Sequence, residues 1–105
     1  MSTEEYRLKR VDVSLSAAIV RRLQREGRTL KQIGDMMELT HAFISQVKNE
    51  KKSLTIARLE MLEKALNRPL PIIFLQAVEE SPRPKELERS YRHLAKVLGE
   101  GADDR

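Results

Sequence analysis

The stretch TLKQIGDMMELTHAFISQVKNEKK, residues 29–52, decides the fold because it predicts two short helices separated by a very short turn. Thr29 is followed three residues later by Gln32, which is the spacing of a capping box at a helix start. Thr40 can cap the next helix in a similar way. We therefore predict one helix over residues 30–39 and a second over residues 40–49.

Apolar spacing in the same stretch predicts how these two helices pack. Five residues are expected to point inwards and wedge the helices together: Ile33, Met37, Leu39, Ile44 and Val47. The small Gly34 allows the second helix of the pair to approach the first closely. Two helices joined in this way form a helix-turn-helix, with the second helix protruding from the surface.

The rest of the sequence predicts an all-α chain. Aromatic residues make up only 4% of it, and β-branched runs are scarce, which argues against a packed sheet. An earlier helix is expected to start at Ser14 or Ser16 and to end at Gly27. A later helix spans about residues 55–66, and Pro71 is well placed in the first turn of a fifth helix.

These elements divide the chain into five parts. We expect an amino-terminal arm or short strand over residues 1–13, a helical domain over 14–80, a proline-containing linker over 81–85, an amphipathic helix over 86–98 and a tail over 99–105. The arm could carry Arg7, Lys9 and Arg10 towards a phosphate backbone, but we favour a plain arm or strand with no direct role in binding.

Composition narrows the functional classes. The net charge is +4, and residues 1–52 hold eleven basic and seven acidic residues, whereas residues 53–105 hold nine of each. The positive excess therefore lies in the first half, which suits a phosphate-facing surface and equally suits a solvated basic face. The chain has no cysteine, and its longest apolar stretch, LPIIFLQAV, is far shorter than the roughly 20 residues that span a bilayer. We expect a soluble cytoplasmic protein without membrane contact.

The run ISQVKNEKK, residues 44–52, resembles the helix-turn-helix proteins of the Cro and lambda-repressor family, also called the xenobiotic-response-element family. Ile44, Val47 and Asn49 match that family's usual isoleucine, aliphatic and asparagine positions. The resemblance covers about residues 19–78 and implies a five-helix DNA-binding domain, to which this chain adds the carboxy-terminal amphipathic helix. It also implies a transcriptional regulator that contacts the major groove of double-stranded DNA with residues 40–49.

The resemblance and the outward polar positions together suggest which residues contact DNA. Residues expected to face base edges are His41, Ala42, Ser45 and Gln46. Gln46 is the strongest of these, because an amide can donate to and accept from adenine N7 and N6. Residues at helix starts or in the following loop are better suited to phosphates, namely Thr29, Lys31, Thr40, Lys48, Asn49, Lys51, Lys52 and Ser53.

Three positions depart from the family pattern. Leu30 stands where the family often has a glutamine that contacts phosphate and braces the second helix of the pair. Glu38 and Glu50 stand at two positions that are commonly glycine, one in the turn and one in the loop, and a left-handed backbone there carries a modest penalty. Because two acids near a DNA surface weaken binding, we expect either moderate affinity or help from a second subunit.

A homodimer on a palindromic operator fits this expectation, since dimeric DNA-binding proteins of this kind place two DNA-contacting helices about 34 Å apart. Candidate interface residues come from an apolar run and from the last helix: Ile72, Ile73, Leu87, Tyr91, Leu94 and Leu98. Packing onto the chain's own core is the alternative for that helix. Another functional class is a protein-interaction regulator, such as an antitoxin or anti-activator, that uses these apolar surfaces on a protein partner.

Catalysis is not expected. The chain has two histidines, no cysteine, no glycine-rich phosphate loop and no paired-histidine metal motif. We therefore predict no catalytic residue, no metal site and no cofactor.

Overall fold

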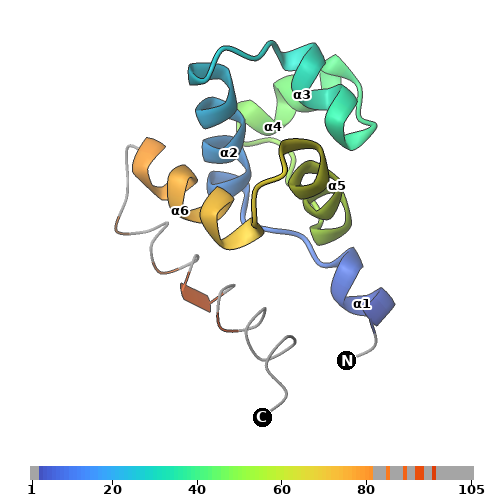
Figure 1. Ribbon diagram of the computed structural model, residues 1–105, viewed down its shortest axis with the longest axis vertical. Helices are drawn as coiled ribbons and strands as arrows, with labels where there is room; N and C mark the ends of the chain where they lie inside the picture. Colours follow the sequence, from blue (N-terminus) through green and yellow to red (C-terminus); the bar gives the residue numbers. More distant parts are fainter. Residues whose placement is uncertain (1–2, 82–84, 86–88, 90–91, 94–95, 97–105) are drawn as a thin grey trace.

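The computed structural model describes residues 3–81 together with residues 85, 89, 92, 93 and 96 (Figure 1). Within this part the protein is all-helical, without a strand, which confirms the prediction of an all-α chain. Its six helices are α1 (Thr3–Leu8), α2 (Val13–Arg25), α3 (Leu30–Met37), α4 (His41–Lys48), α5 (Ile56–Leu66) and α6 (Leu70–Glu80).

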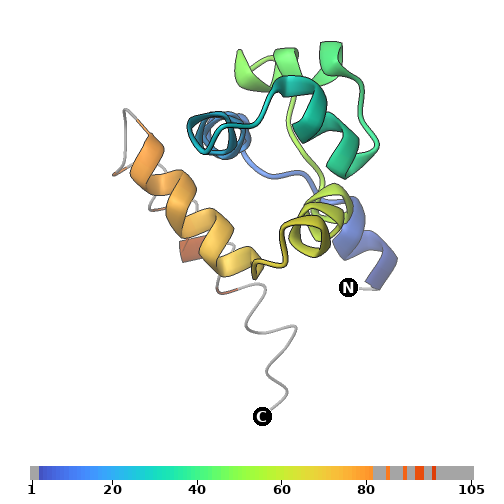
Figure 2. The ribbon, with the colours of Figure 1, turned by 45° about the horizontal axis from the view of Figure 1, so that its top comes forward.

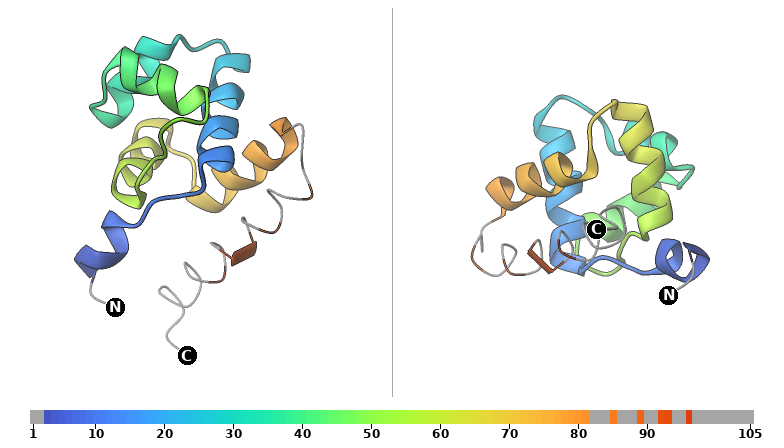
Figure 3. Two further views of the ribbon diagram at one scale, coloured as in Figure 1. Left: turned by 180° about the vertical axis from the view of Figure 1, so that it is seen from behind. Right: turned by 60° about the horizontal axis from the view of Figure 1, so that its bottom comes forward.

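Helix α2 is the centre of the packing. It contacts α6, α4 and α3, while α5 contacts α1, α3 and α6 (Figures 1 and 2). Seen from behind, α2 lies between α6 and the α3–α4 pair (Figure 3). Leu15, Ile19 and Leu23 recur every four residues along α2 and are essentially fully buried. They belong to one apolar cluster with Ile33, Ile44 and other buried residues of every helix from α2 to α6.

Side-chain caps define where four of the helices begin. Thr29 and Gln32 form the predicted capping box, and the hydroxyls of Thr40 and Thr55 accept hydrogen bonds at the starts of α4 and α5. Helix α2 starts earlier than predicted, because the Asp12 carboxylate accepts from the Ser14 N–H at 2.8 Å. Ser16, the other predicted cap, is buried inside α2.

The amino-terminal segment differs from the predicted arm or strand. Residues 3–8 form α1, which packs against α5 through an ion pair of 2.9 Å between Arg7 Nε and Glu60 Oε1. Among the described residues, bridge pairing is confined to an antiparallel bridge between Arg10 and Thr55. Residues 3–8 of the predicted arm or strand are thus helical, and this helix contacts α5.

The segment after α6 is described in only a few positions. Of residues 86–98, the structure describes Arg89, Arg92, His93 and Lys96, which are helical and exposed. The predicted interface residues Leu87, Tyr91, Leu94 and Leu98 lie outside the described residues, as do most of the predicted linker and the whole tail. Among the helices of the described part, none has the length and apolar character that a membrane span requires.

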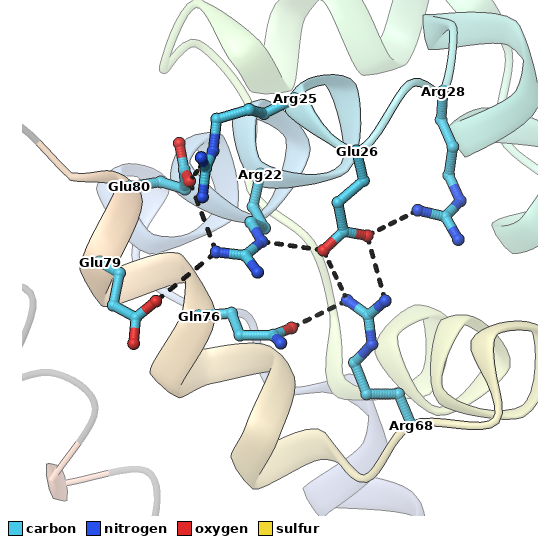
Figure 4. A network of polar contacts seen from close by, with 8 residues as sticks. All are labelled: Arg22, Arg25, Glu26, Arg28, Arg68, Gln76, Glu79 and Glu80. Carbon is cyan, nitrogen blue, oxygen red and sulfur yellow. Dashed lines mark hydrogen bonds and ion pairs between the residues drawn. The ribbon is translucent and has the colours of Figure 1, made fainter.

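Charged side chains join the carboxyl end of α2 to α6 (Figure 4). Glu26 accepts from Arg22 at 2.8 Å, from Arg28 at 2.6 Å and from both terminal nitrogens of Arg68 at 3.0 and 3.2 Å. Desolvation by burial raises the pKa of Glu26, but these three guanidinium groups outweigh it and hold the pKa at about 2, against an ordinary 4.5.

The same network continues onto α6. Arg68 also donates to the Gln76 amide at 2.8 Å, and Arg22 lies 3.5 Å from Glu79 and 3.6 Å from Glu80. Arg25 pairs with Glu80 as well. We call this group, centred on Glu26, the α2–α6 network.

Candidate nucleic-acid interface

The turn between α3 and α4 has the sharp geometry that the sequence predicted. Glu38 ends α3 in the left-handed region, at φ 55° and ψ 41°. Its N–H donates to Asp35 O at 3.4 Å, and the Leu39 N–H donates to Gly34 O at 2.9 Å, which is a Schellman ending. A Cβ atom on Gly34 would lie 2.4 Å from Leu39 O and 3.3 Å from Ile44 Cγ1. Only glycine therefore permits this approach without a shift of the backbone.

Helix α4 has a buried face and an exposed face. Ile44 and Val47 are fully buried against α2 and α3, as predicted. His41, Ala42 and Gln46 are exposed, and Ser45 is half-buried. The four residues predicted to contact bases thus lie on the part of α4 directed away from the core, and α3 and α4 together form one end of the described domain (Figure 1).

The starts of α3 and α4 both carry an exposed threonine. The Thr29 hydroxyl accepts from the Gln32 N–H and the Thr40 hydroxyl from the Phe43 N–H, each at 3.1 Å. Each hydroxyl hydrogen is still able to donate to an acceptor such as a phosphate oxygen. Lys31 is exposed and forms an ion pair of 3.0 Å with Asp35 one turn later, so this lysine has an internal partner.

The loop after α4 holds the remaining predicted phosphate ligands. Asn49, Lys51 and Lys52 are exposed, while Lys48 and Ser53 are half-buried. Glu50 adopts φ 60°, and a second Schellman pair of hydrogen bonds, from Glu50 N–H to Val47 O and from Lys51 N–H to Gln46 O, closes the helix. Glu38 and Glu50 thus both adopt the left-handed backbone conformation that favours glycine.

Two arginines outside the motif contact the carboxyl ends of its helices. Arg21 of α2 donates to Lys48 O at 3.2 Å, and Arg58 of α5 donates to Met37 O at 3.0 Å. A guanidinium group at a helix carboxyl end satisfies a free carbonyl and complements the helix dipole. Neither contact was predicted, since nothing in residue spacing shows which distant arginine reaches which carbonyl.

The Glu50 carboxylate is directed towards α2. It accepts from the Ser14 hydroxyl at 3.0 Å, and its other oxygen lies 3.9 Å from Arg21 Nη2. Glu50 was expected to oppose DNA as an acid, but its carboxylate has a hydroxyl donor and a guanidinium group of α2 as partners. Glu38, in contrast, is exposed.

The segment before α2 lies beside the same loop. Arg10 is exposed and donates to Ser53 O at 3.3 Å. Val11 N–H donates to Leu54 O at 2.8 Å, and the buried Ser16 hydroxyl accepts from the Leu54 N–H at 3.0 Å. The loop that follows α4 is therefore attached to α2 and to the segment that precedes it.

The two predicted interface residues on α6 have different surroundings. Ile73 is 3% exposed and belongs to the core, so its prediction as an interface residue was wrong. Ile72 is 41% exposed, and Leu75 on the same helix is 46% exposed. Of the four consecutive apolar residues 72–75, the two in the middle are therefore buried and the two at the ends are exposed.

Within the part of the chain that the structure describes, no three acidic, histidine or cysteine side chains group as metal ligands would. Comparison with known proteins gives no further assignment, because no protein-family model, no curated protein and no solved structure matches this chain significantly.

Proposed function

We propose that this protein is a sequence-specific double-stranded DNA-binding regulator that inserts α4 into the major groove. The observation that carries this proposal is the division of α4 into a fully buried apolar side and an exposed side with His41, Ala42 and Gln46. Such a helix at the end of a domain, held close to α3 by Gly34, has dimensions that suit a groove about 12 Å wide.

The surroundings of α4 support the same proposal. Threonine hydroxyls lie at the starts of α3 and α4, and Lys51 and Lys52 are exposed in the loop after α4. Hydroxyls and ammonium groups at such positions contact phosphate and set the register of a helix in the groove. The lambda-repressor-like arrangement of helices that the sequence resemblance implies belongs to this proposal.

The test compares two exposed positions that have different expected roles. Gln46→Ala should weaken binding to a selected DNA sequence by about 1–3 kcal/mol and relax the preference at one base pair. Lys51→Ala should weaken binding to all sequences alike and reduce the dependence of log Kd on log salt by about one unit. Lys64→Ala, which removes an exposed charge at the carboxyl end of α5, is the control and should change neither quantity.

Binding sites selected from random DNA and then measured by fluorescence anisotropy at several salt concentrations supply both readouts. Absence of any retained sequence at low salt, or an equal loss on selected and random DNA for Gln46→Ala, contradicts the proposal. Two half-sites in the selected sequence would support a homodimer.

One observation favours the second candidate, a regulator that binds a protein partner. Ile72 and Leu75 are both large apolar side chains exposed on α6, three residues apart and therefore on one side of the helix. The same pair also suits a homodimer contact that would place two α4 helices on one operator. Ile72→Glu with Leu75→Glu separates the cases: loss of dimer in light scattering together with loss of cooperative DNA binding supports the homodimer, and retention of both supports a different partner for this surface.

A further inference from the structure

A group of three side chains connects α2 to the carboxyl end of α4. Arg21 donates to Lys48 O at 3.2 Å and lies 3.9 Å from Glu50, and the Ser14 hydroxyl donates to Glu50 at 3.0 Å. We call Ser14, Arg21 and Glu50 the α4 brace. Its two members on α2 contact Lys48, the last residue of α4, and Glu50, the left-handed residue that follows.

The brace accounts for a residue that is otherwise unfavourable in two respects. Glu50 has φ 60°, where a non-glycine residue is strained, and its negative charge lies on the surface that is proposed to face phosphates. Its carboxylate nonetheless has a hydroxyl donor and a guanidinium partner on α2. A glycine would suit the backbone but would leave the loop without this connection.

We propose that Arg21 and Glu50 are positioning residues, which fix the carboxyl end of α4 and the loop over residues 49–53 so that α4 enters the groove at one defined angle. This inference rests on the proposed DNA-binding function. The two side chains act through α4 and its loop, and neither has to contact a base.

A different role for Arg21 makes opposite predictions. Its side chain is 36% exposed and could contact a phosphate directly. In that case Arg21→Gln weakens binding to selected and random DNA equally, and Glu50→Gln leaves binding unchanged or strengthens it because an acid is removed. If Arg21 and Glu50 position α4, each substitution should instead lower the ratio of the affinity for selected DNA to the affinity for random DNA. An incorrectly oriented α4 loses base contacts before it loses phosphate contacts.

The experiment measures that ratio for Arg21→Gln, Glu50→Gln and the double variant. We expect each single variant to lower it about fivefold and the double variant to lower it by less than the product of the two single effects, because the two residues share one contact, although each also has a contact of its own. Arg25→Gln, which changes an exposed arginine on α2 that pairs with Glu80, is the matched control and should keep the ratio. Urea unfolding confirms that each variant is folded.

The positioning role is rejected if both single variants keep the ratio of affinities for selected and random DNA. It is also rejected if the two single effects multiply in the double variant. Failure of the proposed function has a separate signature, since the unsubstituted protein would then bind no DNA selectively. Amide hydrogen exchange in the free protein still tests the brace in that case. The amides of Asn49, Glu50 and Lys51 should exchange faster in both single variants, and unchanged exchange there rejects the connection.

Discussion

The α3–α4 end of the domain and the contact between α2 and α6 use charged side chains for different purposes. At the α3–α4 end, apolar packing and the close backbone approach at Gly34 hold the two helices to each other, charged side chains contact only their carboxyl ends, and the lysines around them are exposed. Between α2 and α6, arginines and glutamates are mutually paired around Glu26 and join the two helices (Figure 4).

This difference has a practical consequence. Salt and acid weaken ion pairs far more than they weaken apolar packing. A salt titration of DNA binding should therefore report on contacts with phosphate while α3 and α4 keep their packing. The α2–α6 network is the part whose stability should depend on pH.

The largest expected effect tests the packing at the α3–α4 end. Gly34→Ala should lower the free energy of unfolding by about 3 kcal/mol, because the new Cβ would lie 2.4 Å from Leu39 O, a backbone atom that must move. Alanine is a better helix former than glycine, so propensity alone predicts a gain. Urea unfolding monitored by circular dichroism measures the change.

Gly27→Ala is the matched control for that substitution. Gly27 has φ 102°, and an added Cβ would meet no atom within 4 Å, so the cost there is backbone strain of about 1–2 kcal/mol without a collision. Equal losses at the two glycines would show that the close approach at Gly34 adds nothing to stability.

The second prediction concerns pH at the α2–α6 contact. Because the pKa of Glu26 is about 2 in the folded protein and 4.5 ordinarily, its stabilisation is complete above pH 4.5 and is lost as the pH falls from 4.5 to 2. The pKa difference corresponds to about 3 kcal/mol at most, and partial exposure of the side chain lowers this to about 2 kcal/mol. Unfolding free energies at pH 7, 4.5 and 2.5 measure it.

Glu26→Gln is the comparison, since the amide does not titrate. The stability difference between the unsubstituted protein and this variant should shrink across that pH interval, whereas Gly34→Ala should keep a constant difference. A constant difference for Glu26→Gln as well would contradict a role for its charge in joining α2 to α6.

The two ends also differ in how far the sequence predicted them. Local signals identified the α3–α4 end: the Thr29 and Thr40 caps, the inward Ile33 and Ile44, and the small Gly34 all lie within one stretch and were confirmed. Their pattern depends on helix geometry alone. The prediction that the outward residues of α4 contact bases stays untested.

Contacts between distant residues could not be predicted in this way. Arg68 reaches Glu26 across 42 positions and Arg21 reaches Lys48 across 27, and residue spacing does not identify such partners. The helix α1 was missed for the same reason, since it contacts α5, more than 45 residues later in the sequence. Ile73 was assigned to an interface because four consecutive apolar residues do not reveal which of them faces the core.

The third prediction compares the two left-handed glutamates. Glu38→Gly should raise the free energy of unfolding by about 0.5–1 kcal/mol, because glycine adopts φ 55° without strain and the exposed carboxylate at the end of α3 is removed. Glu50→Gly should give no gain, since the same relief is offset by loss of the contacts with Ser14 and Arg21. Thermal unfolding of both variants measures this, and equal gains would mean that the α4 brace contributes no stability.

The smallest expected change in stability, at Asp35, separates the two uses of charge most directly. Its ion pair with Lys31 is a surface pair one helical turn apart, with both side chains more than 60% exposed. Asp35→Asn should therefore change the unfolding free energy by no more than about 0.5 kcal/mol. Affinity for random DNA should nevertheless rise severalfold at low salt, because a negative charge disappears and Lys31 is released to interact with phosphate.

Glu80→Gln should do the reverse, lowering stability through its arginine partners on α2 and leaving DNA affinity unchanged. If Asp35→Asn altered stability and left DNA affinity the same, charges at both ends of the domain would serve only to hold helices together.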